Sequence, residues 1–185
     1  MDAFADAYCE RPDAAIRERA GHIRLLALDV DGVLTDGGVY MGDTGESFKR
    51  FHIHDGKGLA MLRAEDVAVA IITARRSEAV TRRAQELGIH YVYQGVGDKA
   101  ERLRCLTEEL ALELESVAYV GDDVVDLGAF SRAGLAVAVA NAHPRVRRRA
   151  HWVTARSGGH GAVREVSELI LASQGRLAAQ LQRHA

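Results

Sequence analysis

The stretch Ile23-Arg24-Leu25-Leu26-Ala27-Leu28-Asp29-Val30-Asp31-Gly32-Val33-Leu34-Thr35 decides the fold class, because its apolar run, residues 23–28, is followed directly by two carboxylates. The run predicts a buried β-strand, and Gly32 allows the tight turn that brings Asp29 and Asp31 to one crevice. In open parallel sheets, ligands bind outside the carboxyl ends of the strands. The sequence therefore predicts a functional site at these two acids, with a solvated turn as the structural alternative.

Length and composition limit the class of protein. The chain has 185 residues, 48% of them hydrophobic, which suits one domain with its own core. With a formal net charge of -2 and no long apolar run, we expect neither nucleic acid nor membrane as a partner. The N-terminus has no export signal, so we expect a cytoplasmic protein with Cys105 as a packed, reduced thiol. The one basic cluster, which we interpret as a solvated helix face, comprises Arg145, Arg147, Arg148 and Arg149.

Apolar runs with strand character alternate with segments of helical periodicity along the chain. This alternation predicts an α/β fold built on a doubly wound, mainly parallel, Rossmann-like sheet. We expect one helix between Ser77 and Gly88, a second with its apolar face at Leu103, and a third that begins near Gly161. The predicted strands cover residues 23–30, 67–73, 90–93, 117–120, 136–139 and 151–154.

One segment interrupts this alternation, because residues 37–53 predict a small β-hairpin inserted after the first strand. Its position directly after the two acids predicts that it lies over the crevice, where insertions commonly carry function. We divide the chain into a helical N-terminal preface (1–22), one domain (23–174) that contains the hairpin, and a C-terminal tail (175–185).

Further strand ends carry groups that suit a phosphate. Thr73 and Arg75 supply a hydroxyl and a guanidinium after the second strand, and Lys99 opens a following helix with an ammonium. These donors match the oxygens of a phosphoryl group and a nearby anionic group.

Clustered acids predict a metal ion. The strand at 117–120 leads into Asp122, with Asp123 and Asp126 as accessory acids near it. Such carboxylates repel one another unless a cation is bound, and oxygen ligands favour Mg2+. We assign the Mg2+ site to Asp29, Asp31 and Asp122, with the carboxylates of Asp29 and Asp122 as direct ligands and a backbone carbonyl as a third.

In this order along the chain, the pair Asp29 and Asp31, then Thr73, Lys99 and Asp122, resemble the four motifs of haloacid dehalogenase superfamily phosphatases. The resemblance covers nearly all of residues 23–154. It implies that Asp29 attacks phosphorus and becomes an aspartyl phosphate, while Asp31 protonates the leaving alkoxide and later deprotonates water. Thr73 and Lys99 balance the phosphoryl charge and complete the expected catalytic set.

The gaps between the motifs leave no room for a cap domain, because 44 positions separate Asp29 from Thr73 and 26 separate Thr73 from Lys99. The crevice of a lone subunit is therefore open, which predicts that another subunit completes it. Local matches at 29–37, at the substrate loop 51–56 and at 157–166 narrow the resemblance to the capless branch. That branch includes homotetrameric phosphatases of 3-deoxy-D-manno-octulosonate 8-phosphate.

The resemblance to the capless branch therefore implies a homotetramer, this phosphorylated sugar acid as substrate, and a role in lipopolysaccharide precursor synthesis. The carboxylate of an acidic sugar needs cationic partners, for which Arg75, Arg83 and Arg164 are candidates. For Arg83 the alternative is an ordinary position on a helix surface. The full set of expected substrate-binding residues is Asp31, His52, His54, Asp55, Gly56, Arg75, Arg83, Lys99 and Arg164.

Two alternatives remain open. His54 stands where an arginine is common in this branch, and Ala60 stands where another can occur, so a nonulosonate or another sugar phosphate is the alternative substrate. A receiver-like phospho-acceptor signalling module uses similar residue types on a similar sheet. In a receiver, however, the phosphorylated aspartate follows the acidic pair, whereas here Asp29 and Asp31 come first.

Overall fold

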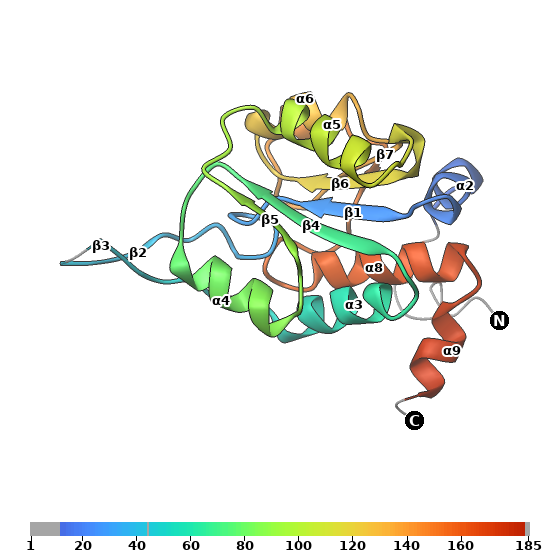
Figure 1. Cartoon of the computed structure of the whole chain (residues 1–185), viewed down its shortest axis with the longest axis horizontal. Helices are drawn as coiled ribbons and strands as arrows, with labels where there is room; N and C mark the ends of the chain where they lie inside the picture. Colours follow the sequence, from blue (N-terminus) through green and yellow to red (C-terminus); the bar gives the residue numbers. More distant parts are fainter. Residues whose placement is uncertain (1–11, 44, 184–185) are drawn as a thin grey trace.

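The computed structural model describes residues 12–43 and 45–183, and its centre is a six-stranded sheet in which every strand is parallel to its neighbours (Figure 1). The strand order is β5-β4-β1-β6-β7-β8, which puts β1 between β4 and β6. Each run predicted from the sequence contains or overlaps one of these strands, so the predicted α/β class is confirmed. The bounds are β1 Leu25–Leu28, β4 Ala68–Thr73, β5 Tyr91–Gln94, β6 Val117–Gly121, β7 Leu135–Ala138 and β8 Trp152–Val153.

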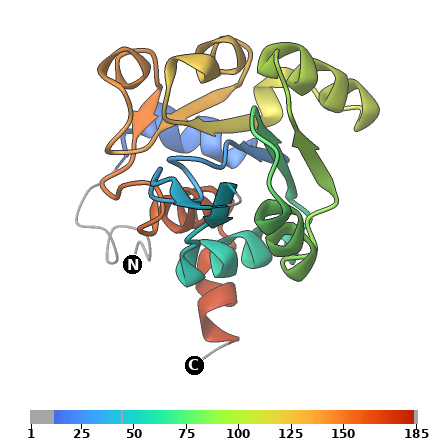
Figure 2. The ribbon, with the colours of Figure 1, turned by 90° about the vertical axis from the view of Figure 1, so that its left-hand side faces the viewer.

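Helices cover both faces of the sheet, as a doubly wound fold requires. Helices α3 (Ile53–Arg63), α4 (Glu78–Glu86) and α8 (Ala162–Ser173) lie on one face, and α5 (Lys99–Glu109) and α6 (Leu127–Phe130) lie on the other (Figures 1 and 2). Ser77 and Gly161 are the N-cap residues of α4 and α8, as predicted. The short elements are η1 Leu114–Ser116, η2 Val124–Asp126 and α7 Pro144–Arg147.

Strand β1 is buried along its whole length because both faces of the sheet are covered. This burial explains why the strand is a continuous apolar run rather than an alternating one. The parallel register sets Leu28 opposite Ile71 of β4 and Val120 of β6. The chain therefore leaves these three strands along one edge of the sheet, and the residues that follow them meet there.

The predicted hairpin consists of β2 (Tyr40–Gly42) and β3 (Gly45–Phe48), which pair antiparallel and project beyond the carboxyl ends of the parallel strands (Figure 1). Thr44, which falls between these two strands in the sequence, lies outside the described residues.

The segment 51–56 differs from its prediction as a loop, because α3 begins at Ile53. The sequence did not indicate this helix because it contains Gly56 and Gly58, and glycine is unfavourable in the interior of a helix. Packing explains one of them: a Cβ on Gly58 would lie 2.9 Å from Ser167 Oγ on α8. Glycine here allows α3 and α8 to approach closely.

The terminal helices join the same core. Helix α2 (Ala14–Gly21) contributes Ile16 and Ala20, and α9 (Leu177–Gln182) contributes Leu177. Residues 1–11 of the predicted preface and 184–185 of the predicted tail lie outside the described residues, and the three-part division stays a prediction. Among the described helices, none has the length and apolar character that a membrane span requires.

Candidate active site

Asp29 directly follows β1 and is 6% exposed. Its Oδ1 accepts a hydrogen bond from Val30 N at 2.7 Å, and its Oδ2 lies 2.6 Å from Lys99 Nζ. Gly32 turns the chain with a φ of 85°, and a Cβ at this position would lie 2.1 Å from Asp122 Oδ2. A glycine is therefore required for the loops after β1 and β6 to approach each other.

Lys99 begins α5 and is buried between two carboxylates. Its Nζ lies 2.6 Å from Asp29 Oδ2 and 2.7 Å from Asp126 Oδ1. Burial disfavours the ammonium, but Asp29 and Asp126 outweigh that effect and raise the pKa of Lys99 above its usual value. Lys99 therefore stays charged and fixes the orientation of the Asp29 carboxylate.

Asp126 has no exposed surface and accepts hydrogen bonds from several donors. Besides Lys99, these are Tyr119 Oη at 3.0 Å, Asp122 N at 3.0 Å and Asp123 N at 3.2 Å. Asp126, predicted as an accessory acid, ties α5, β6 and the loop after β6 together through its carboxylate.

The carboxylates of Asp29, Asp122 and Asp126 form a group whose oxygens lie within 4.8 Å of one another. Asp122 Oδ1 is buried and has no hydrogen-bond partner among the described residues. Burial, followed by the charges of Asp126, Asp29 and Asp123, raises the pKa of Asp122 to about 7. Like charges around an unsatisfied buried oxygen fit a hard divalent cation such as Mg2+. Asp29 and Asp122 belong to the predicted metal set, and Asp126 supplies the third carboxylate of the group. The backbone carbonyl expected as a third ligand stays a prediction.

A crevice of about 270 Å³ opens at this edge of the sheet, lined by Asp29, Asp31, Thr73, Arg75, Lys99 and Asp122 among others. Thr73 is 2% exposed, at the end of β4. The carboxylate of Asp31 lies at the lip and forms an ion pair with Lys49, which follows β3 of the hairpin. The sequence did not single out Lys49; the only signal for it was the predicted position of the hairpin over the crevice.

Residues 157–161 pack on the turn that follows β1. Gly159 N donates a hydrogen bond to Val33 O at 2.9 Å, and Gly158 N donates one to Asn141 Oδ1 at 2.9 Å. A Cβ on Gly158 would lie 1.7 Å from Gly32 O, so the two backbones touch. This segment therefore supports the turn of its own subunit.

Asp55 joins the start of α3 to the start of α8. It is 1% exposed, and its Oδ1 accepts a hydrogen bond from Arg164 N at 2.8 Å. Burial raises the pKa of Asp55, against the hydrogen bond from Arg164 N. The side chain of Arg164 pairs with Glu168 at 2.5 Å. These contacts face the helix pair rather than the crevice.

Within one subunit, seven of the nine predicted substrate-binding residues line one of two separate spaces. Asp31, Arg75 and Lys99 line the crevice. A second hollow beside Phe51 has a volume of about 10 Å³, about the least that can admit one water molecule. It is lined by the predicted residues His52, Asp55, Gly56 and Arg83, whereas His54 and Arg164 line neither space.

Packing explains the position of Arg83. Its guanidinium lies 6.0 Å from the ring centroid of Phe51 and pairs with Glu86 at 2.9 Å. A Cβ on Gly56 would lie 2.3 Å from Arg83 Nη2, so the glycine leaves space for this side chain. Within its own subunit, Arg83 therefore packs beneath α3 instead of lining the crevice.

The role of Asp126 predicts a loss of stability when its charge is removed. An Asp126→Asn substitution should lower the free energy of unfolding by about 3 kcal/mol, because the buried ammonium of Lys99 loses a partner and an amide cannot satisfy every donor. The matched control is Asp123→Asn, at an exposed carboxylate whose side chain caps η2, with an expected loss below about 1 kcal/mol. Urea unfolding measures both values, and equal losses would contradict the assignment.

Comparisons with known proteins give the family of the chain. The family described as haloacid dehalogenase-like hydrolase matches residues 89–166. The 3-deoxy-D-manno-octulosonate 8-phosphate phosphatase KdsC of Escherichia coli (strain B / BL21-DE3) is 48% identical to this chain, over 92% of each protein.

Solved structures are similar as well. The crystal structure of a 3-deoxy-D-manno-octulosonate 8-phosphate phosphatase from Moraxella catarrhalis, in complex with magnesium ion, phosphate ion and a KDO molecule, has a TM-score of 0.90 and 43% identity, covering 92% of this chain and 98% of that one. The cobalt-bound enzyme from Haemophilus influenzae has a TM-score of 0.86 and 37% identity, covering 89% and 99%. The sheet, the carboxylate group and this identity along nearly the whole chain lead to one conclusion: the chain belongs to the 3-deoxy-D-manno-octulosonate 8-phosphate phosphatase family of haloacid dehalogenase-like hydrolases.

Proposed function

We propose that the chain hydrolyses 3-deoxy-D-manno-octulosonate 8-phosphate to the free sugar acid and inorganic phosphate, with Asp29 as nucleophile. The observation that carries the proposal is the buried group of Asp29, Lys99 and Asp126 beside Asp122. It combines an oriented carboxylate, a fixed ammonium and oxygen ligands for a cation. Phosphoryl transfer to a carboxylate depends on such positioning and charge stabilisation.

In the first half-reaction, a carboxylate oxygen of Asp29 attacks phosphorus and the bond from phosphorus to the sugar oxygen breaks. The hydrogen bond from Val30 N and the ion pair with Lys99 keep the attacking carboxylate in one orientation. Asp31 protonates the departing sugar oxygen. The Thr73 hydroxyl and the Lys99 ammonium offset charge on the phosphoryl oxygens.

In the second half-reaction, Asp31 accepts a proton from water, and the water oxygen attacks phosphorus. The bond between phosphorus and Asp29 breaks, which releases phosphate and restores the carboxylate. The ion pair with Lys49 orients Asp31, whose side chain lines the crevice. A bound Mg2+, for which Asp29 and Asp122 are the candidate side-chain ligands, supplies positive charge to the phosphoryl oxygens.

The choice of sugar acid rests on the relatives. The protein from Moraxella catarrhalis was crystallised with magnesium, phosphate and KDO, that is, with a metal and both products of the proposed reaction. In this chain, Arg75 lines the crevice and is the candidate partner for the sugar carboxylate. A cytoplasmic location is part of the proposal, and the free thiol of Cys105 suits a reducing compartment.

Removal of either crevice acid should abolish most of the activity. Asp29→Asn should lower kcat by at least about 1,000-fold, because an amide cannot attack phosphorus, and Asp31→Asn by about 100- to 10,000-fold. Phosphate release is measured with Mg2+ on octulosonate 8-phosphate, a nonulosonate phosphate and glucose 6-phosphate. Asp66→Asn is the matched control, since this residue lies at the opposite edge of the sheet, with a φ of 60° that asparagine tolerates. Wild-type activity in Asp29→Asn would refute the assignment of Asp29 as the nucleophile. Faster turnover of the nonulosonate phosphate would refute octulosonate 8-phosphate as the preferred substrate.

We also propose a homotetramer in which neighbouring subunits complete each crevice. The hairpin exposes large apolar side chains, with 50% of Val39, 68% of Met41 and 57% of Phe48 accessible. Val125, which lines the crevice, is 56% exposed. Apolar side chains gathered in one region of a surface favour a protein–protein interface. We assign the hairpin to that interface.

A charge on the hairpin should dissociate the assembly. Met41→Asp should reduce the mass measured by light scattering below that of a tetramer and raise KM, because a carboxylate resists burial between subunits. Leu181→Asp is the control, at a residue that is 40% exposed on α9, far from the hairpin (Figure 1). A monomeric wild-type protein with full activity would contradict the proposal.

A further inference from the structure

A cavity of about 470 Å³, larger than both the crevice and the hollow beside Phe51, lies at the opposite edge of the sheet from the crevice. Its walls come from the last turn of α2, from η1, from α6 and the residues that follow it, and from the segment that precedes β8. The residues around it therefore sit at the amino ends of β6, β7 and β8. Neither the sequence analysis nor the proposed phosphatase reaction uses this cavity.

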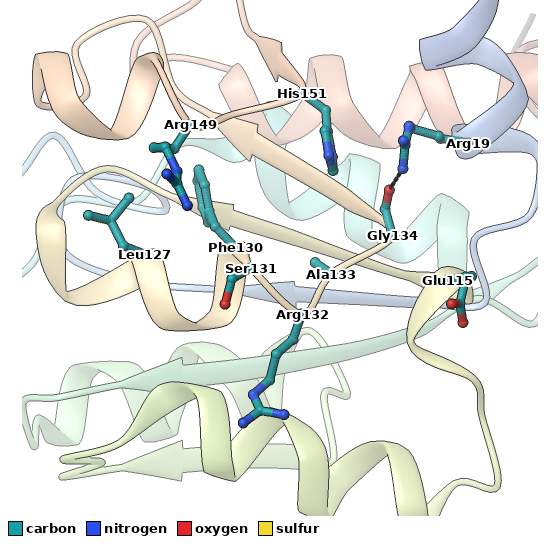
Figure 3. A pocket seen from close by; sticks show the side chains of 10 residues that line it. All are labelled: Arg19, Glu115, Leu127, Phe130, Ser131, Arg132, Ala133, Gly134, Arg149 and His151. Atoms are coloured by element: carbon teal, nitrogen blue, oxygen red, sulfur yellow. Dashed lines mark hydrogen bonds between the residues drawn. The ribbon is translucent and has the colours of Figure 1, made fainter.

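Three arginines and one histidine line this cavity. Arg19, Arg132, Arg149 and His151 line it, and Glu115 is the single acid among its lining residues. Figure 3 shows Arg149, His151 and Arg19 along one wall, whereas Arg132 is directed away from them. This concentration of positive charge contrasts with the formal net charge of -2 of the whole chain.

The donors of this wall are available to a ligand. The side chain of Arg149 is exposed and has no hydrogen-bond or ion-pair partner within residues 12–43 and 45–183. Arg19 donates one hydrogen bond, from Nη1 to Gly134 O at 2.6 Å, and keeps its other guanidinium donors. Arg149 also belongs to the basic cluster that the sequence analysis interpreted as a solvated face.

His151 adds a neutral donor to the same wall. Its Nδ1 accepts a hydrogen bond from Ala136 N at 3.0 Å, which puts the ring proton on Nε2. Burial, followed by the charge of Arg19, lowers the pKa of His151, so the ring is neutral at pH 7. The other charged residues that line the cavity are Arg149, Arg132 and Glu115.

The remaining wall is apolar. Leu127 and the buried ring of Phe130 line the cavity on the Arg149 side (Figure 3). A volume of about 470 Å³ exceeds what one inorganic ion needs and falls in the range of small-molecule sites. Guanidinium groups pair bidentately with phosphate oxygens, while the apolar wall accepts a small organic body.

We propose that this cavity binds a small organic phosphate monoester, with its phosphate on Arg149, Arg19 and His151 and its carbon skeleton against Phe130 and Leu127. The site is separate from the catalytic crevice and needs neither Mg2+ nor turnover.

The test is a titration of the isotope-labelled full-length protein with propylphosphonate, a monoester mimic that the phosphatase cannot hydrolyse. The imidazole signals of His151, assigned with a His151→Gln variant, should shift and saturate. Inorganic phosphate at the same ionic strength should bind more weakly, because it leaves the apolar wall empty.

Three variants make the test specific. Arg149→Ala should raise the dissociation constant at least about tenfold, since it removes a charged hydrogen-bond donor worth more than 1.4 kcal/mol. Two control variants should leave the titration unchanged. One is Arg148→Ala, at the adjacent exposed arginine outside the cavity, and the other is Asp29→Asn, in the crevice. The proposal would be overturned if the His151 signals did not saturate in the wild-type protein. It would also be overturned if Arg149→Ala kept the wild-type titration or if Asp29→Asn abolished it. Equal or tighter binding of inorganic phosphate would overturn the organic ligand class.

Discussion

The pairing of one buried ammonium with two buried carboxylates is the interaction on which the active site depends. Lys99 lies between Asp29 and Asp126, and all three side chains are almost entirely removed from water. Each charge would be costly alone in such a place, and removal of one partner from a buried pair typically costs about 3–5 kcal/mol. The group therefore holds the Asp29 carboxylate in one orientation, which a nucleophile in phosphoryl transfer requires.

The fold supplies this arrangement through adjacency and close approach. Parallel strands β1, β4 and β6 end at one edge of the sheet, so residues distant in sequence converge without a dedicated domain. Two glycines then bring the loops into contact, Gly32 against Asp122 and Gly158 against the backbone of Gly32. The turn that carries the acids is thus packed from both sides. The active site depends on backbone contacts as much as on its charged side chains.

Much of this site was predictable because its residues occupy positions that local patterns define. Asp29 ends an unbroken apolar run, and Lys99 starts a helix with a clear apolar face. The unpredicted contacts are long-range: Asp126 meets Lys99 from 27 residues away, and Lys49 meets Asp31 from 18. The periodicity of apolar residues along the sequence carries no information about such distant pairs. Nor can it tell whether Arg83 faces a ligand or packs beneath a neighbouring helix, because that depends on the space left by Gly56.

The most direct test of the central claim is a crystal structure of the protein with Mg2+ and tetrafluoroaluminate, a planar analogue of the transferring phosphoryl group. We expect aluminium in line with a carboxylate oxygen of Asp29, with the opposite axial oxygen within hydrogen-bond reach of Asp31 and a fluoride beside Lys99. Aluminium in line with any group other than Asp29 would contradict that claim.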